Sequence, residues 1–172
     1  MKMRQKTKKL VMAALLAALI CVATMLIKIP TPLKGYVNLG DGIVLVAGWM
    51  LAPAYGFAAA GIGSALADVF LGYVAYAPAT FLIKGVMAWM AGYGHKWFSR
   101  RWGALPSRMI SGFTAEIGMV LGYYVFEGIL YGFVPSVVNI PGNGFQAVVG
   151  WVVGVVLIRV LEKSKALSQW KT

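Results

Sequence analysis

Charged side chains are scarce in this sequence, and its acidic residues occupy unusual positions. Four of the five acidic residues lie within or beside long apolar stretches: Asp41, Asp68, Glu116 and Glu127. Lys84 lies in a similar stretch, whereas Glu162 is next to the basic C-terminal end. An ionisable side chain in an apolar stretch is costly and by default indicates a functional site. We therefore expect these groups to bind a polar partner, either one another or a ligand.

Amides and tyrosines accompany these charges along the chain. Hydrogen bonds from amides and carboxylates, together with stacking on tyrosine rings, suit a small polar aromatic ligand. The candidate substrate-binding residues are Tyr36, Asn38, Asp41, Asp68, Tyr76, Lys84, Asn139, Asn143 and Gln146. The single cysteine and the single histidine offer no metal-ligand spacing, so no metal site is expected.

Purely structural interpretations of the same residues remain open. Asp41 can cap the N-terminus of the helix that follows Asn38-Leu39-Gly40. Asp68 and Lys84, 16 residues apart, can form an ion pair between neighbouring helices. Tyr76 can belong to an interfacial aromatic belt, and Glu116 can bond a hydroxyl inside a helical bundle.

The composition indicates the environment in which these residues must be positioned. Hydrophobic residues make up 60% of the 172 positions, charged residues make up 12%, and the mean hydropathy is +0.76. Soluble domains are roughly half apolar and a quarter charged. We therefore predict an all-α membrane protein, a single domain over 1–172 formed by a bundle of six transmembrane helices.

The expected helices are separated by prolines, which are tolerated at helix boundaries. Their ranges are 10–29, 39–52, 54–75, 79–98, 107–132 and 143–162. A membrane-spanning helix needs roughly 20 residues, so the second helix is short. Five crossings, with that helix re-entrant or merged, are the alternative.

The basic residues predict the orientation of the bundle. Most of the 16 Lys and Arg residues lie in the N-terminal segment 1–9, in the loop 95–108 or after residue 158. By the positive-inside rule, both termini are cytoplasmic, including the tail 163–172. The net charge of +11 then reflects this topology and contact with anionic lipid, with no nucleic-acid partner expected. This orientation places the candidate binding residues in the outer part of the bundle.

Small residues and a missing motif predict dependence on partners. Helix 10–29 carries Ala13, Ala14, Ala17 and Ala18, and small residues four apart allow helices to approach closely. This face can pack inside the bundle or against another membrane subunit. The chain lacks the phosphate-binding pattern GxxxxGK[ST], so it cannot itself drive uptake with ATP.

Several segments together resemble the S components of energy-coupling factor (ECF) transporters. They are 36–41 (YVNLGD), 61–68 (GIGSALAD), 77–80 (APAT), Lys84-Gly85 and 139–143 (NIPGN), with Gln146 and Gly150. The resemblance covers residues 10–162. It implies a non-enzymatic subunit of a prokaryotic plasma membrane that binds a vitamin on its outer side.

Membership of this family also implies partners and a ligand class. The partners would be a transmembrane coupling subunit, facing Ala13 and Ala17, and two ATPase subunits that hold ATP and Mg²⁺; no cofactor is expected in this chain. The pattern resembles most the branch for hydroxymethylpyrimidine- or pyridoxine-type vitamins and is similar to the riboflavin branch. A stand-alone proton-coupled carrier is the alternative, and an intramembrane enzyme lacks a visible nucleophile and base.

Overall fold

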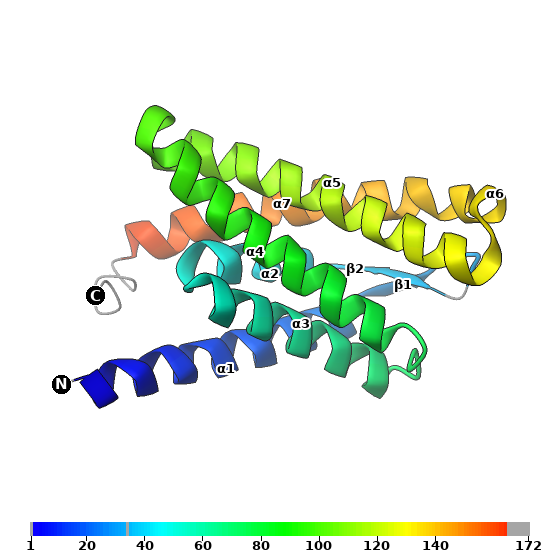
Figure 1. The fold of residues 1–172 in the computed structure, drawn as a ribbon, viewed down its shortest axis with the longest axis horizontal. Helices are drawn as coiled ribbons and strands as arrows, with labels where there is room; N and C mark the ends of the chain where they lie inside the picture. Colours follow the sequence, from blue (N-terminus) through cyan, green and yellow to red (C-terminus); the bar gives the residue numbers. More distant parts are fainter. Residues whose placement is uncertain (1, 34, 165–172) are drawn as a thin grey trace.

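The computed structural model describes residues 2–33 and 35–164, with side chains from residue 5 onward. The predicted tail from residue 165 therefore lies outside the described residues. The described helices are α1 (Lys2–Leu26), α2 (Asp41–Met50), α3 (Pro53–Phe70), α4 (Ala77–Trp102), α5 (Ala104–Tyr131), α6 (Phe133–Ser136), η1 (Val137–Asn139) and α7 (Ile140–Lys163). Figure 1 shows the longer helices side by side in one bundle, with the start of α1 and the end of α7 at the same end. The all-α membrane fold predicted from the sequence is confirmed.

Prolines and glycines mark the helix boundaries, as expected from their backbone chemistry. Helices α3, α4 and α7 each have a proline in the first two positions. The N–H groups there make no hydrogen bond within the helix, so proline loses none. Gly103, with φ of 78°, joins α4 to α5, and Gly132, with φ of 91°, follows α5. Residues with a side chain rarely adopt such positive φ values, so glycine is suited to these two chain reversals.

The connection between α1 and α2 differs from the prediction. Tyr36 and Asn38 fall between the expected helices 10–29 and 39–52, where no regular structure was predicted. The chain there forms an antiparallel hairpin of β1 (Lys28–Pro30) and β2 (Tyr36–Asn38). Strand β1 is exposed, whereas β2 is largely buried and contacts α1 and α7. Strand β2 therefore carries Tyr36 and Asn38 into the bundle. Figure 1 shows the hairpin following α1.

The buried strand explains how the second crossing is made with so short a helix. The 10 residues of α2 rise about 15 Å, roughly half of a hydrocarbon core. Strand β2 precedes α2 and adds about 3.3 Å per residue to the crossing. Irregular backbone at membrane depth needs internal hydrogen bonds. Here the Asn38 N–H donates to Gln146 Oε1 at 2.8 Å, and the Gly40 N–H donates to Asn38 Oδ1 at 2.9 Å.

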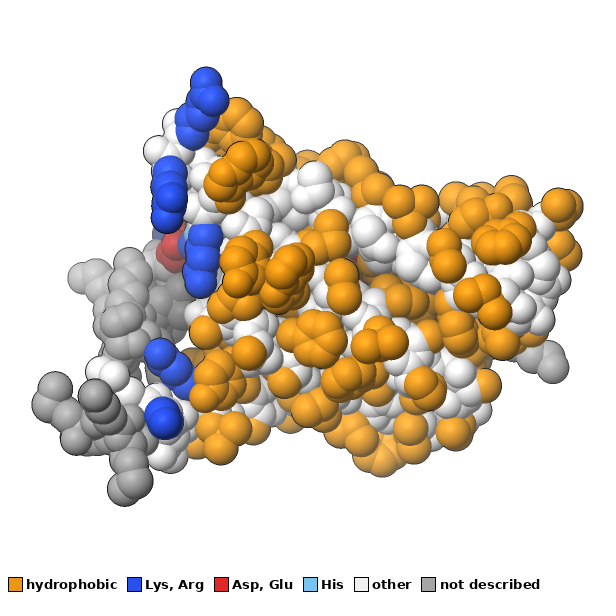
Figure 2. Space-filling model, viewed as in Figure 1, with side chains coloured by type: hydrophobic (Ala, Val, Ile, Leu, Met, Phe, Trp, Pro, Cys, Tyr) orange, Lys and Arg blue, Asp and Glu red, His pale blue; other side chains and the backbone are white. Residues whose placement is uncertain are grey.

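The surface matches the predicted orientation in a membrane. In Figure 2 the Lys and Arg side chains gather at the end where α1 starts and α7 ends, and hydrophobic side chains are spread over the rest of this face. Among the described residues, three stretches are long and apolar enough to cross a membrane: Gln5–Leu26, Ala104–Tyr131 and Phe133–Lys163. The basic end is therefore the cytoplasmic end, and the hairpin lies toward the outside.

Close contacts between backbones hold α1, α2, α3 and α4 together. A Cβ at Gly63 would collide with the carbonyl oxygen of Ala17, and one at Gly48 would collide with that of Ala88. Ala13 belongs to the buried core, so this row of alanines faces α3. Ala14 and Ala18, one position further along, lie on the exposed face of α1.

Candidate functional site

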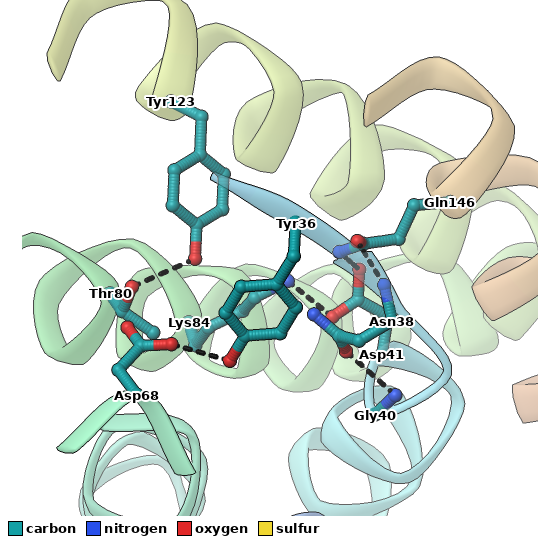
Figure 3. A network of polar contacts seen from close by, with 9 residues as sticks. All are labelled: Tyr36, Asn38, Gly40, Asp41, Asp68, Thr80, Lys84, Tyr123 and Gln146. Atoms are coloured by element: carbon teal, nitrogen blue, oxygen red, sulfur yellow. Dashed lines mark hydrogen bonds and ion pairs between the residues drawn. The ribbon is translucent and has the colours of Figure 1, made fainter. Parts of the chain in front are cut away.

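A buried ion pair lies at the centre of the polar residues. Lys84 on α4 donates to the Asp41 carboxylate at the start of α2, and both side chains are at most 2% exposed. Gln146 on α7 donates its amide to Asp41 Oδ2 at 2.6 Å. Figure 3 shows these side chains converging from three helices. This arrangement lets a buried lysine and a buried carboxylate compensate each other.

Two structural interpretations from the sequence are corrected here. The expected ion pair of Lys84 with Asp68 is wrong, because the ion-pair partner of Lys84 is Asp41. Asp41 is also not a helix cap: Gly40 occupies the N-cap position, and no side chain caps α2. The Asp41 carboxylate is instead turned toward α4 and α7, where the donors of Lys84 and Gln146 satisfy it.

Asp68 belongs to a second group of polar contacts, between β2 and α3. The Tyr36 hydroxyl donates to Asp68 Oδ1 at 2.5 Å, and the Tyr36 ring lies 4.7 Å from that of Tyr73 between centroids. Nearby, the hydroxyls of Thr80 and Tyr123 lie 3.1 Å apart and join α4 to α5 (Figure 3). The hairpin is thus tied to α3 by a hydrogen bond to a carboxylate, among the stronger hydrogen bonds in proteins.

Glu127 on α5 organises the third group. Asn139 donates to Glu127 Oε1 at 2.9 Å, and the Tyr76 hydroxyl lies 3.4 Å from the same oxygen. That hydroxyl also donates to the Leu33 carbonyl at 2.7 Å. Tyr76 is only 6% exposed, so it does not belong to the interfacial belt considered as an alternative. It instead connects the hairpin to α4.

The three groups enclose a small cavity beneath the hairpin. It has a volume of about 20 Å³, close to that of one water molecule. Its lining comprises Thr24, Thr31, Gly35, Tyr36, Asn38, Ser64, Asp68, Tyr76, Thr80, Lys84, Tyr123, Glu127, Asn143 and Gln146. Asp68 Oδ2, Glu127 Oε2 and the hydroxyls of Thr31 and Ser64 have no hydrogen-bond partner among the described residues. Native proteins rarely leave buried polar atoms unpaired, so these atoms are available to a ligand.

Comparison with known proteins identifies the family. A profile described as "ECF-type riboflavin transporter, S component" matches residues 4–163. The chain belongs to this family. A protein of Pyrococcus woesei described as an uncharacterized protein in a gap 3' region is 36% identical over 145 residues, covering 84% of this chain and 95% of the relative.

Solved structures share the fold. The S component of a bacterial ECF transporter is 22% identical, with a TM-score of 0.73 over 92% of this chain and 97% of the other. An S component for biotin from an ECF-type ABC transporter is 23% identical, with a TM-score of 0.50 over 91% and 93% of the two chains. With the family match over residues 4–163, the protein is the substrate-binding subunit of an ECF transporter, a multi-pass protein of the prokaryotic plasma membrane.

The predicted binding residues of this S component occupy two layers. Seven line the cavity: Tyr36, Asn38, Asp68, Tyr76, Lys84, Asn143 and Gln146. Asp41 and Asn139 lie behind them, hydrogen-bonded to Gln146 and Glu127 respectively. These two residues therefore position lining side chains in the structure.

Other lining residues were absent from the predicted set. Helical spacing could have identified some of them, because Thr80 lies one turn before Lys84, and Tyr123 lies one turn before Glu127. Ser64, one turn before Asp68, carries the same signal. Thr24 and Thr31 do not, because hydroxyl residues are common in membrane helices and turns. The expected hydroxyl partner of Glu116 is also missing: neither carboxylate oxygen has a hydrogen-bond partner in the described chain.

Proposed function

We propose that this S component captures a small heteroaromatic vitamin or vitamin precursor from the outside, of the hydroxymethylpyrimidine or pyridoxine type. The observation that supports this proposal is the set of unpaired hydrogen-bond acceptors on residues that line the cavity. Asp68 Oδ2 and Glu127 Oε2 each require a donor, and tyrosine rings lie beside both. Hydroxymethylpyrimidine offers an amino and a hydroxyl group on a flat ring, and pyridoxine offers hydroxyl groups on one.

The size of the cavity favours a small ligand. With about 20 Å³ of free volume, the closed site must open even for a single heteroaromatic ring, because small-molecule pockets usually measure roughly 300–1,000 Å³. The hairpin is the element best placed to move, since β1 is exposed and only β2 is buried. Riboflavin, named in the family description, is the alternative ligand and would require a larger displacement.

We further propose that transport depends on a coupling subunit in the membrane and two ATPase subunits that bind ATP and Mg²⁺. A lone chain of this kind binds the vitamin but does not accumulate it. The alternative is a proton-coupled carrier, in which Asp68, Glu116 or Glu127 would carry protons. The two hypotheses differ in what the isolated protein can do in a sealed vesicle.

Two measurements on the purified protein test these proposals. In a thermal-shift screen, hydroxymethylpyrimidine or pyridoxine should raise the unfolding temperature, because a ligand that binds only the folded state stabilises it. A shift with riboflavin alone would replace the proposed ligand. Liposomes that contain only this chain should bind the vitamin without accumulating it. Accumulation driven by a proton gradient would contradict the proposed dependence on ATPase partners.

A further inference from the structure

A second, larger cavity lies between α5 and α7, on the outside of the bundle. It has a volume of about 240 Å³, and its walls are almost entirely apolar. Phe113, Ile117 and Leu121 form the α5 wall, with Gly144 and Val148 on α7. The four large side chains among them are also exposed on the bundle surface, so the groove opens toward the lipid. It is separate from the polar cavity beneath the hairpin, because the two share no lining residue.

One carboxyl group interrupts this apolar groove. Glu116 lines it and is 1% exposed, and neither of its oxygens has a hydrogen-bond partner in the part of the chain that the structure describes. A buried polar group without a partner is costly. On the side that faces Gly150 and Asp41, the Glu116 carboxyl is closely packed. A Cβ at Gly150 would lie 2.7 Å from Glu116 Oε1 and 2.6 Å from Asp41 Cβ. The lining of the groove supplies no other hydrogen-bonding side chain to this carboxyl.

Glycine at position 144 keeps the groove open. A Cβ added at Gly144 would meet no atom within 4 Å, in contrast to most other glycines of the bundle. The space beside α7 is thus wide enough for an apolar chain, and the nearest hydrogen-bonding group is Glu116. The combination requires an occupant with an apolar body and one polar end.

We propose that this groove binds a membrane-soluble amphiphile whose head, a hydroxyl or ammonium group, donates a hydrogen bond to Glu116. The apolar chain lies along α5 and α7 between Phe113 and Val148. The amphiphile enters from the bilayer, since the groove opens there, and it satisfies the carboxyl that the protein leaves unpaired. This site is independent of the vitamin, whose proposed cavity lies beneath the hairpin.

Quenching of tryptophan fluorescence by brominated chains tests the proposal. The Trp151 ring lies 5.9 Å from that of Phe113 between centroids, so a bromine in the groove quenches Trp151 at close range. The purified protein is titrated with 10-bromo-1-decanol and, in parallel, with 1-bromodecane, which lacks the head. We expect saturable quenching with the alcohol and only non-saturable quenching with the bromoalkane. Trp151→Phe should remove the saturable part and so assign it to this groove.

Two variants separate the head from the chain. The Cβ of Gly144→Leu meets open space, so this variant places a side chain in the groove and should abolish saturable quenching. Glu116→Leu should weaken the apparent affinity for the alcohol roughly tenfold, as for a lost hydrogen bond to a carboxyl. Glu116→Gln, which retains an acceptor, should weaken it less. Saturable quenching that is equal for both compounds, or unchanged in Gly144→Leu, would overturn the proposal. The thermal shift with the vitamin reports on the other cavity and is expected to persist in Gly144→Leu.

Discussion

Lys84 on α4 forms its buried ion pair with Asp41 at the start of α2, while Asp68 on α3 accepts its hydrogen bond from Tyr36. The pairing fixes which helices depend on each other. Helices α2, α4 and α7 meet at Asp41, whereas α3 is linked to the hairpin. Substitutions in the two groups should therefore have different consequences.

Breaking the buried pair should destabilise the protein strongly. Lys84→Met leaves the Asp41 carboxylate buried without its cation, and removing one partner of a buried pair costs about 3–5 kcal/mol. The double variant Lys84→Met/Asp41→Leu should be more stable than Lys84→Met alone. Thermal unfolding in detergent measures this. A matched control is Arg108→Met, because the Arg108–Glu162 pair at the cytoplasmic end is partly exposed and should contribute about 1 kcal/mol or less. Equal losses in both single variants would contradict this interpretation.

Neutralising the unpaired acceptors should weaken binding and leave the fold intact. Asp68→Asn and Glu127→Gln each exchange an acceptor for a donor, so each should lower vitamin affinity about 10- to 100-fold. Isothermal titration calorimetry gives the dissociation constants. Thr114→Val is the control and should leave affinity unchanged, because Thr114 does not line the cavity and precedes Glu127 by 13 residues on α5. Unchanged affinity in Asp68→Asn would place the ligand elsewhere.

The contact of α1 with α3 should be sensitive to a single methyl group. Gly63→Ala pushes a Cβ into the Ala17 carbonyl, and overpacking of this kind costs about 1–3 kcal/mol. Gly144→Ala is the matched glycine substitution in a helix, and its Cβ meets open space. It should therefore leave the unfolding temperature unchanged or raise it. A comparable loss for both variants would mean that helix propensity, rather than the contact, is being measured.

The two alanine rows of α1 should respond differently to tryptophan. Ala14→Trp/Ala18→Trp enlarges the exposed face, so it should spare vitamin binding and weaken co-purification with the coupling subunit. Ala13→Trp/Ala17→Trp changes the row packed toward α3, so it should lower the unfolding temperature as well. If only the second pair affected assembly, without a loss of stability, the coupling face would be Ala13 and Ala17, as the sequence resemblance implies.

The orientation can be tested with one cysteine at a time. In a Cys21→Ala background, Val74→Cys lies at the exposed turn between α3 and α4, and Ala104→Cys lies at the opposite end, where α5 begins. An impermeant maleimide should label Val74→Cys in intact cells and Ala104→Cys only after permeabilisation. Labelling of Ala104→Cys in intact cells would reverse the topology.

The helices were predictable from the sequence, and most of their boundaries lie within a few residues of the expected positions. Apolar length and proline placement depend on local sequence, so they determine spans such as 107–132 without tertiary information. The hairpin was not predictable, because β1 and β2 are three residues each and β1 contains Pro30, a residue that is unusual in strands. It forms because the bundle offers Gln146 as a partner for the Asn38 backbone.

The site was predictable in its composition and not in its pairings. Apolar surroundings singled out Asp41, Asp68 and Lys84, since burial of charge has a recognisable cost. Lys84 can pair with Asp41 or with Asp68 according to how far α2 and α3 each extend into the bundle. The position of α2 depends on β2, which precedes it. Gln146, 105 residues after Asp41, completes that network through packing that no local pattern encodes.

A single residue, Ile27, separates the end of α1 from the start of β1. The helix that exposes Ala14 and Ala18 is therefore joined, through one residue, to the strand pair that covers the polar cavity. Thr24, in the last turns of α1, also lines that cavity. A change in the tilt of α1 must displace the hairpin, and a ligand that lifts the hairpin must pull on α1. If the vitamin binds in this cavity as proposed, α1 would act as a lever whose short arm, the hairpin, covers the ligand.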